Sequence, residues 1–454
     1  MKTKIISGLL CLATCAMIGS CDKWIDSSIN VDPNNLTSAS LKVILPTAEA
    51  GLAYQMGGDI GRYVGLFNQH YTGVSRQSAG YYGYTFTESD DNNIWEFNMY
   101  AGCMKDMSDI ITIARNTGAP HYQGVGEVLM AYSLGTMSDL WGDIPYADCF
   151  KGNGNLTPAY QSQQEIYSAI QNLLDSALIH CSAAASNFKP GADDLVFGGK
   201  MANWSKTASV LKARYALHLA KQDAAGYTKA LAALDAKNFA GNADDAQFIF
   251  GSLETEANPL YQFMDQRGDI SMGPVIIALM DTLDPRLPKF AGLDATKKYS
   301  QESAPGAFYA SINSPVPFVT YAEAKFIEAE AAFQTGNKAR AHTAFVEGIT
   351  ASCAKTGADS VTIAAFLKMP KIDPGEANLT LQKIMEQKYV ALFTMAESWT
   401  DWRRTGFPTL TPITGSQVPR RFPYPLSERT RNRVQLEKVS AGVSLFSRVW
   451  WDKP

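Results

Sequence analysis

The chain has 454 residues, of which 46% are hydrophobic and 19% are charged, and its net charge is −4. This length suits about three average domains or one large domain, and the composition excludes a disordered chain, a collagen and a polytopic membrane protein. Because basic residues are not in excess, the charge argues against nucleic acid as the main partner.

The first 20 residues have the three parts of a secretory signal. Two lysines are followed by an apolar run from Ile5 to Ile18, and small residues precede Cys21. The apolar run is shorter than the ~20 residues that span a bilayer, so it is a targeting segment. Ile18-Gly19-Ser20-Cys21 also has the order of a bacterial lipobox. We therefore expect a signal peptide over 1–20 and a lipid on Cys21, and an ordinary signal peptide with a chance cysteine is the weaker alternative.

The segment that follows the leader has no helical period. Residues 21–40 are rich in Asp, Asn and Ser, and we expect them to form a lipid-anchored tether. Four cysteines lie beyond it, at 103, 149, 181 and 353, and no C-x-x-C or His/Cys cluster groups them. They are interpreted as buried thiols rather than as a zinc site, while one disulfide stays open in an exported protein.

From Leu41 onward, amphipathic helices with turn signals between them dominate the sequence. Apolar residues at helical spacing predict a final helix over 381–396 and three helix pairs, 125–140 with 166–181, 204–222 with 227–237 and 321–335 with 338–355. In the last pair, Thr320 and Glu323 have the spacing of a capping box, and Gly336-Asn337 separates the two helices. Successive hairpins of this kind bury each other's apolar faces and build a curved, tetratricopeptide-like scaffold.

The sequence therefore predicts a mainly α fold with few short strands. We expect one helical domain over 41–454 with long irregular insertions at about 57–92, 238–318 and 405–454. Long loops on a rigid scaffold usually carry the function of a protein.

Common catalytic signatures are missing. The chain has no G-x-S-x-G, H-E-x-x-H or G-x-x-x-x-G-K-[ST] motif, and its five histidines include no pair at metal-ligand spacing. His218 flanks an apolar stripe and is interpreted as a core histidine. Acidic doublets at 90–91, 193–194 and 244–245 are interpreted as solvated turns, with a calcium site as the minority alternative. We predict no catalytic residue, metal or cofactor, although the two carboxylates of a glycosidase need no local motif.

Aromatic residues crowd the segment 57–86, where they suit stacking on the apolar faces of sugar rings. The alternative is that these rings pack against the helices. A second loop, 305–318, combines aromatic residues with Gly, Ser and Pro. The candidate ligand contacts are, in order, Tyr81, Tyr82 and Tyr84, then Phe308 and Tyr309, with Asn68, Gln69 and Arg76 as polar partners.

Arginines gather near the C-terminus. Asp401 precedes Arg404 by three residues, and Arg420-Arg421 follow shortly after. Two arginine pairs could form an anion site, but we favour ion pairs and carbonyl contacts that attach the C-terminal loops to the scaffold. The segment Trp141 to Tyr146 is interpreted as a structural corner.

Short motifs follow one another in a fixed order along the whole mature chain. They are the leader with Cys21, Asp32-Pro33-Asn34-Asn35, Trp141-Gly142-Asp143-Ile144-Pro145-Tyr146, Asp284-Pro285-Arg286-Leu287, Thr320-Tyr321-Ala322-Glu323 with Glu328-Ala329-Glu330-Ala331, Trp402-Arg403-Arg404-Thr405-Gly406-Phe407-Pro408 and Arg420-Arg421-Phe422-Pro423-Tyr424-Pro425. Together they resemble the SusD/RagB family of Bacteroidetes outer-membrane lipoproteins. The resemblance implies a tetratricopeptide-like fold on the cell surface that captures a glycan, or in some members a peptide, for a SusC-type TonB-dependent transporter. It assigns no ligand contact, because the shared motifs are structural.

The leading hypothesis is a non-enzymatic, lipid-anchored protein of the outer membrane, facing the cell exterior, that delivers an oligosaccharide to the transporter. The alternatives are a peptide-binding member of the same family, a surface glycoside hydrolase, and an adhesive helical-repeat protein without a small ligand.

Overall fold

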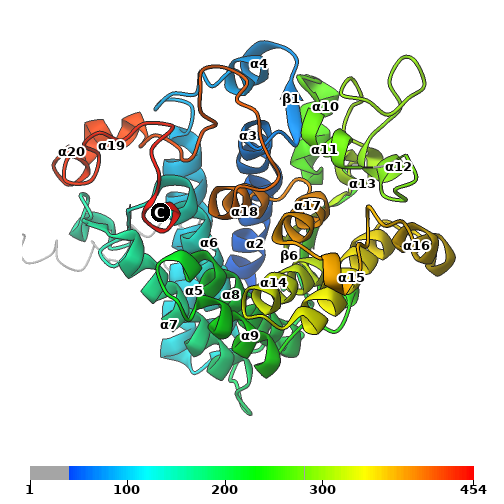
Figure 1. Cartoon of the computed structure of the whole chain (residues 1–454). Helices are drawn as coiled ribbons and strands as arrows, with labels where there is room; N and C mark the ends of the chain where they lie inside the picture. The colour runs from blue at the N-terminus through cyan, green and yellow to red at the C-terminus, as the bar shows by residue number, and fades with distance from the viewer. Residues whose placement is uncertain (1–39, 281, 454) are drawn as a thin grey trace, which may run out of the picture.

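The computed structural model describes residues 40–280 and 282–453. The signal peptide, Cys21 and most of the tether lie outside the described residues. The described chain is mainly helical, as predicted, and α2 (Leu41–Gly57) lies near the centre of the view in Figure 1. No helix among the described residues is long and apolar enough to span a membrane.

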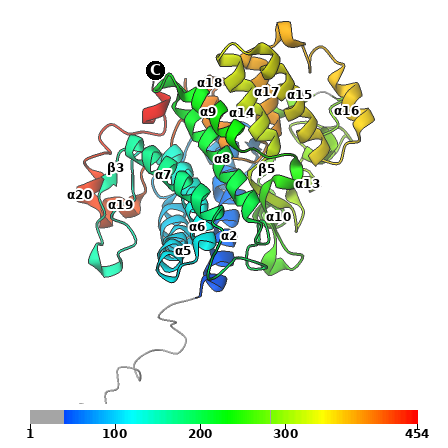
Figure 2. The same ribbon diagram turned by 90° about the horizontal axis from the view of Figure 1, so that it is seen from below.

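The three predicted helix pairs are confirmed. Neighbouring pairs pack against one another through α7 with α8 and α9 with α14, which produces the stacked scaffold seen in Figure 2. The pairs are α6 (Pro120–Trp141) with α7 (Gln163–Cys181), α8 (Met201–His218) with α9 (Gly226–Ala236), and α14 (Tyr321–Gln334) with α15 (Lys338–Lys355).

The capping box predicted at the start of α14 is half formed. The Thr320 hydroxyl accepts a hydrogen bond from the Glu323 backbone N–H at 3.1 Å, which caps the helix. The Glu323 carboxylate turns away and accepts two bonds of 2.6 Å from Arg214 on α8. A tertiary ion pair therefore replaces the local contact that the sequence spacing suggested.

The remaining helices lie around and between these pairs (Figure 1). They are α3 (Asp59–Phe67), α4 (Arg76–Tyr82), the π-helix η1 (Ile94–Met104), α5 (Lys105–Thr117), α10 (Pro259–Gln266), α11 (Pro274–Leu279), α12 (Leu287–Phe290), α13 (Ala307–Ala310), α16 (Ser360–Leu367), α17 (Leu381–Ala391), α18 (Glu397–Thr405), α19 (Leu426–Arg431) and α20 (Arg433–Leu436).

Strands are few and short, as expected. They form antiparallel pairs, β1 (Tyr71–Gly73) with β5 (Ile270–Met272), β2 (Ile144–Pro145) with β3 (Tyr160–Gln161), and β4 (Ala246–Ile249) with β6 (Pro315–Val319). Tyr71 lies opposite Met272, so β1 brings the segment after α3 to the loop before α11.

The prediction that 57–92 is irregular is wrong over much of its length, because α3 and α4 lie within it. A Cβ atom on Gly65 would collide with the Tyr71 ring, so this glycine permits close packing rather than flexibility. The helix predicted over 381–396 ends early, at Ala391. A break that contains Thr394, with a φ of 74°, separates it from α18, which begins at Glu397.

The C-terminal loop forms part of the core rather than covering it. The ring of Phe422 is fully buried and lies 5.3 Å from Trp141, 6.0 Å from Trp399 and 5.9 Å from Phe67. Residues about 350 positions apart in the sequence therefore share one aromatic cluster.

The acidic doublets are not solvated turns, because the second member of each is buried. Asp194 accepts bonds from the backbone N–H groups of Phe197 and Gly199 and from the Trp204 indole. Asp91 accepts the Trp141 indole N–H at 2.9 Å, and Asp245 caps the start of α14. These carboxylates organise loops by satisfying buried donors. Within the described residues, Cys103, Cys149, Cys181 and Cys353 are free thiols, and all are buried except Cys149, which is half-buried.

Candidate functional site

Two of the predicted ligand-binding tyrosines lie in the core. Only 4% of Tyr81 and 9% of Tyr84 is exposed, and Tyr81 packs edge-on against Tyr63 at 5.0 Å. The Tyr81 hydroxyl donates to Asp90 at 2.6 Å, and burial raises its pKa well above the ordinary range. The Tyr84 hydroxyl accepts the Ile413 N–H at 3.1 Å. In this conformation neither ring offers a free face for stacking, whereas Tyr82, at the end of α4, is half-buried.

The polar candidates likewise divide into buried and accessible side chains. Asn68 is fully buried and its amide donates to the Ser398 hydroxyl at 2.7 Å, while Gln69 is 2% exposed and donates to the Thr411 carbonyl at 2.5 Å. Arg76 has a side chain 59% exposed and pairs with the buried Asp269 at 2.6 Å. Arg76 is therefore the polar candidate that solvent and ligand can reach.

The second predicted loop forms the short helix α13. Phe308 and Tyr309 are half-buried, with ring centroids 4.9 Å apart, and Tyr309 packs against Phe290 and Phe393 at 5.0 Å each. Tyr309 borders two cavities of about 40 and 20 Å³, and Phe308 borders the second. Such cavities hold a few waters at most, and neither includes Tyr82. These cavities therefore do not connect Tyr82 with Phe308 or Tyr309, although Tyr71 of the first segment and Tyr309 of the second both pack against Phe393.

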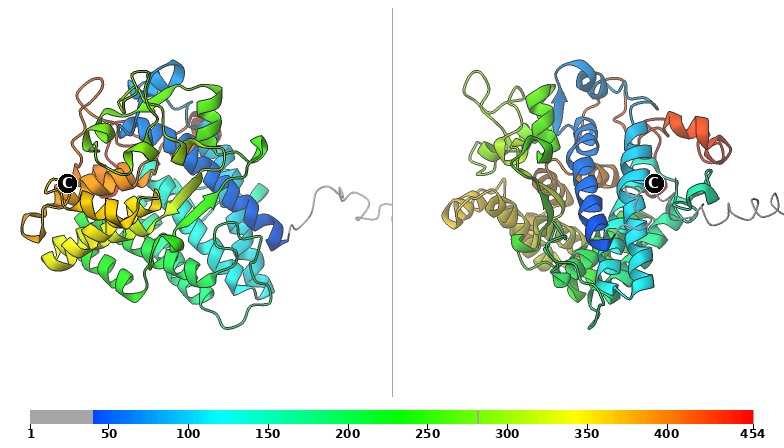
Figure 3. Two further views of the ribbon diagram at one scale, coloured as in Figure 1. Left: turned by 90° about the vertical axis from the view of Figure 1, so that its right-hand side faces the viewer. Right: turned by 180° about the vertical axis from the view of Figure 1, so that it is seen from behind.

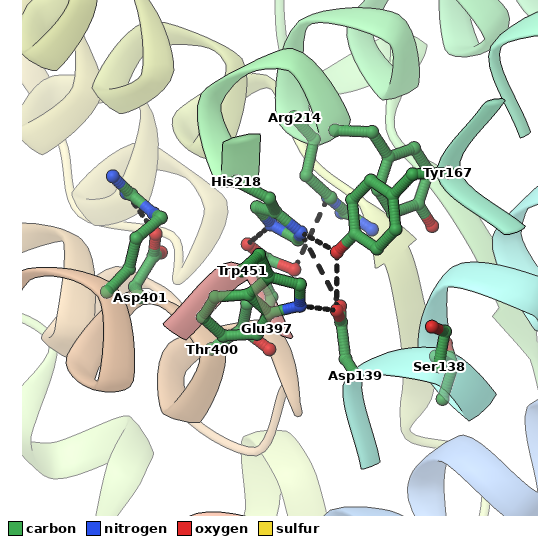
Figure 4. A network of polar contacts seen from close by, with 12 residues as sticks. Ser138, Asp139, Tyr167, Arg214, His218, Glu397, Thr400, Asp401 and Trp451 are labelled. Atoms are coloured by element: carbon green, nitrogen blue, oxygen red, sulfur yellow. Dashed lines mark hydrogen bonds and ion pairs between the residues drawn. The ribbon is translucent and has the colours of Figure 1, made fainter. Parts of the chain in front are cut away.

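A buried polar network connects the helix pairs to the C-terminus (Figure 4). His218 on α8 is fully buried, its Nε2 lies 2.7 Å from Glu397 on α18, and its Nδ1 lies 2.8 Å from the Tyr167 hydroxyl. The Asp139 carboxylate accepts bonds from Tyr167 at 2.5 Å and from the Trp451 indole at 2.9 Å. His218 is the satisfied core histidine that the sequence predicts.

The network contains side chains that could bind a metal, but its charges do not favour a bound cation. Ligand atoms of Asp139, His218 and Glu397 lie within 4.8 Å of one another. Desolvation lowers the pKa of His218 to about 4 and raises that of Glu397 to about 7. The buried Arg214 guanidinium lies 3.7 Å from Glu397, so a positive charge already occupies this side of the cluster. The arrangement therefore suits a hydrogen-bonded support for three helices better than a bound cation.

The C-terminal arginines attach the loops to the scaffold, as predicted. Arg404 binds both oxygens of Glu330 on α14, at 2.5 and 2.7 Å, and Asp401 at 2.7 Å. Arg420 binds Asp452 through two bonds of 2.6 Å, and Arg421 donates to the Trp141 carbonyl at the predicted corner. These arginines have internal partners, which supports the structural interpretation over the anion site.

A large groove lies away from all the predicted contacts. It has a volume of about 920 Å³ and lies between α2, η1 and the segment from β4 to α10; Figure 3 shows α2 beside these elements. Tyr54 on α2 and Phe97 on η1 border it, and they are 48% and 59% exposed. No sequence motif marks the groove, because its walls come from separate parts of the chain. The sequence feature that could have revealed the groove is Phe97, a large apolar residue that is exposed although it lies between the buried residues Trp95 and Met99.

Comparisons with known proteins agree with this fold. A SusD/RagB family protein from Bacteroides thetaiotaomicron is 24% identical, with a TM-score of 0.77 over 91% of this chain and 99% of its own. A chitin-binding SusD homologue from Flavobacterium johnsoniae is 22% identical, with a TM-score of 0.77 over 91% and 98%. A SusD homologue from Bacteroides fragilis is 21% identical, with a TM-score of 0.76 over 92% and 100%.

The comparison with curated proteins gives no match. Residues 33–425 match the SusD-like family, which is described as "Starch-binding associating with outer membrane". This match covers most of the sequence, and the TM-scores show that the similar structures share this fold. The chain therefore belongs to the SusD-like family of nutrient-binding proteins associated with the outer membrane.

Proposed function

We propose that this protein is a lipid-anchored receptor on the outer face of the outer membrane, which binds an oligosaccharide and delivers it to a SusC-type TonB-dependent transporter. The observation that carries the proposal is the family match over residues 33–425. The lipobox supports attachment through Cys21, where two or more acyl chains give stable anchoring and one does not.

Among the residues that the sequence predicts as ligand contacts, the accessible ones are Tyr82, Phe308, Tyr309 and Arg76. We propose that the exposed parts of these rings stack on sugar faces while the Arg76 guanidinium bonds to hydroxyl groups. The buried candidates support the loops from inside, through their bonds to Asp90, Ser398 and the 411–413 segment.

The first test concerns location and partner. Native protein solubilised from outer membranes should copurify with a large barrel protein, and a Cys21→Ala variant should leave the membrane fraction when the barrel is absent. Native protein that purifies alone, under conditions that preserve other membrane complexes, would contradict the transporter partnership.

The second test concerns the ligand. A glycan array followed by calorimetry should find an oligosaccharide ligand, and the same sample should leave that glycan uncleaved. Binding only to peptides would support the peptide-binding alternative, and turnover of the glycan would support a hydrolase. Tyr82→Ala should lower the affinity about tenfold without changing the circular dichroism spectrum.

A further inference from the structure

The groove between α2, η1 and the β4 to α10 segment gathers accessible rings on its walls. Tyr54 and Phe97 are about half exposed, and Ile249 on β4 is 63% exposed. Scattered exposed apolar residues are ordinary, but here they surround one hollow of about 920 Å³, which is at the upper end of the range of small-ligand sites.

Amide side chains lie between the rings. Asn98 donates to Gln55 at 3.1 Å, and the Tyr54 hydroxyl donates to Gln262 at a long 3.5 Å. Within the described part of the chain, the Asn98 carbonyl oxygen and the Gln55 amide nitrogen have no further hydrogen-bond partner. Rings that stack and amides that both donate and accept are the groups that recognise a neutral sugar.

The charged residues that line the groove also favour a neutral ligand. Its lining contains the carboxylates of Asp106 and Glu256 and no Lys, Arg or His side chain. An acidic glycan placed here would meet like charges without a cation to compensate them. A protein partner would favour a continuous apolar patch, whereas this surface is hollow and interrupted by amides.

We infer that this groove is a binding site for an uncharged oligosaccharide, separate from the loops that carry Tyr82 and Phe308. The inference rests on the proposed function as a glycan receptor, and it adds a location and a charge selectivity. Tyr54 and Phe97 provide the stacking faces, Asn98 and Gln55 bond to hydroxyl or acetamido groups, and the two carboxylates exclude acidic sugars.

The experiment is calorimetry of the full mature chain with chitohexaose, maltohexaose and xylohexaose as neutral probes and with hexagalacturonate as the acidic probe. Variants Tyr54→Ala and Phe97→Ala are compared with Phe188→Ala, a matched control because Phe188 is 52% exposed and does not border the groove. Tyr82→Ala and Phe308→Ala test the predicted loops separately.

We expect at least one neutral probe to bind, with affinity reduced about tenfold or more in each groove variant and unchanged in the Phe188 control. Hexagalacturonate should bind only after Asp106→Asn and Glu256→Gln are combined. Since the altered rings are exposed or half-buried at the surface, circular dichroism should be unchanged in every variant.

Different results separate the inference from the proposed function. Full affinity for the neutral probe in both groove variants would overturn the inference and leave the receptor function intact. Tight binding of hexagalacturonate to wild type would overturn the charge selectivity. If no glycan on an array or among these probes binds wild type, the receptor function fails and the inference fails with it.

Discussion

Removing the Arg404 side chain should destabilise the protein strongly. Arg404 is 4% exposed and binds both oxygens of Glu330, which is fully buried. Asp401 keeps a second cation, Lys388 at 2.7 Å, but Arg404 provides the direct ionic contact to Glu330. Arg404→Ala therefore leaves a buried carboxylate without its cation, at a cost of about 3–5 kcal/mol.

The assay is thermal and urea denaturation of the mature chain. With an unfolding entropy of about 2 cal/mol/K per residue, this loss lowers Tm by about 3–6 °C for a cooperative chain of this size. Arg429→Ala is the matched control, because Arg429 forms a similar two-bond pair with Glu88 at the surface, where the side chains are 44% and 35% exposed. That pair should contribute only about 0.2–1 kcal/mol.

A double variant separates charge from packing. Arg404→Met with Glu330→Leu replaces the buried ions by apolar groups of similar size and should recover much of the lost stability. If Arg404→Ala costs no more than Arg429→Ala, the arginine is not buried against Glu330 and the reasoning is refuted.

Further changes test the sign of a pKa shift, a close contact and a helix cap. Burial lowers the pKa of His70 to about 3, so the unfolded chain binds a proton that the folded chain does not as pH falls from 6.5 to about 3. The stability of wild type should therefore fall over this range. Between pH 7.5 and pH 5, the unfolding free energy measured with urea should fall by about 2 kcal/mol less in His70→Gln than in wild type. Gly135→Ala, whose Cβ would collide with the buried Tyr215 ring, should cost about 1–3 kcal/mol in thermal melts, while Gly241→Ala meets no atom and should be neutral. Thr320→Ala should cost about 1 kcal/mol through loss of the α14 cap, and an unchanged midpoint in urea would contradict this role.

Local patterns in the sequence were enough to predict the helix pairs. The stripe Ala322, Phe326 and Ala329 repeats with the period of a helix, and Gly336, with φ of 83°, ends that helix. Periodicity reports which face is apolar and where a turn is favourable, and these are the properties that decide a hairpin.

The segment 57–92 was predicted less well, because distant residues decide its structure. Tyr84 and Phe86 look like surface aromatics beside Gly and Ser, but Phe86 packs 5.0 Å from Phe422 and Tyr84 binds Ile413. No local sequence pattern indicates that the C-terminal loop packs against these two residues. The same limit applies to the groove, which is assembled from α2, η1 and β4 and has no motif of its own.

Trp451 and Asp452 lie inside the fold. Trp451 is fully buried and its indole donates to Asp139, while the carboxylate of the buried Asp452 binds Arg420 and Arg448. The core around His218 therefore cannot close until Trp451, which lies 312 residues beyond Asp139, has been synthesised. If the chain is exported from its N-terminus, as the proposed function requires, this arrangement would delay completion of the fold until Trp451 has crossed the inner membrane. Late burial of Trp451 would then keep the chain incompletely folded, and hence translocatable, during that export.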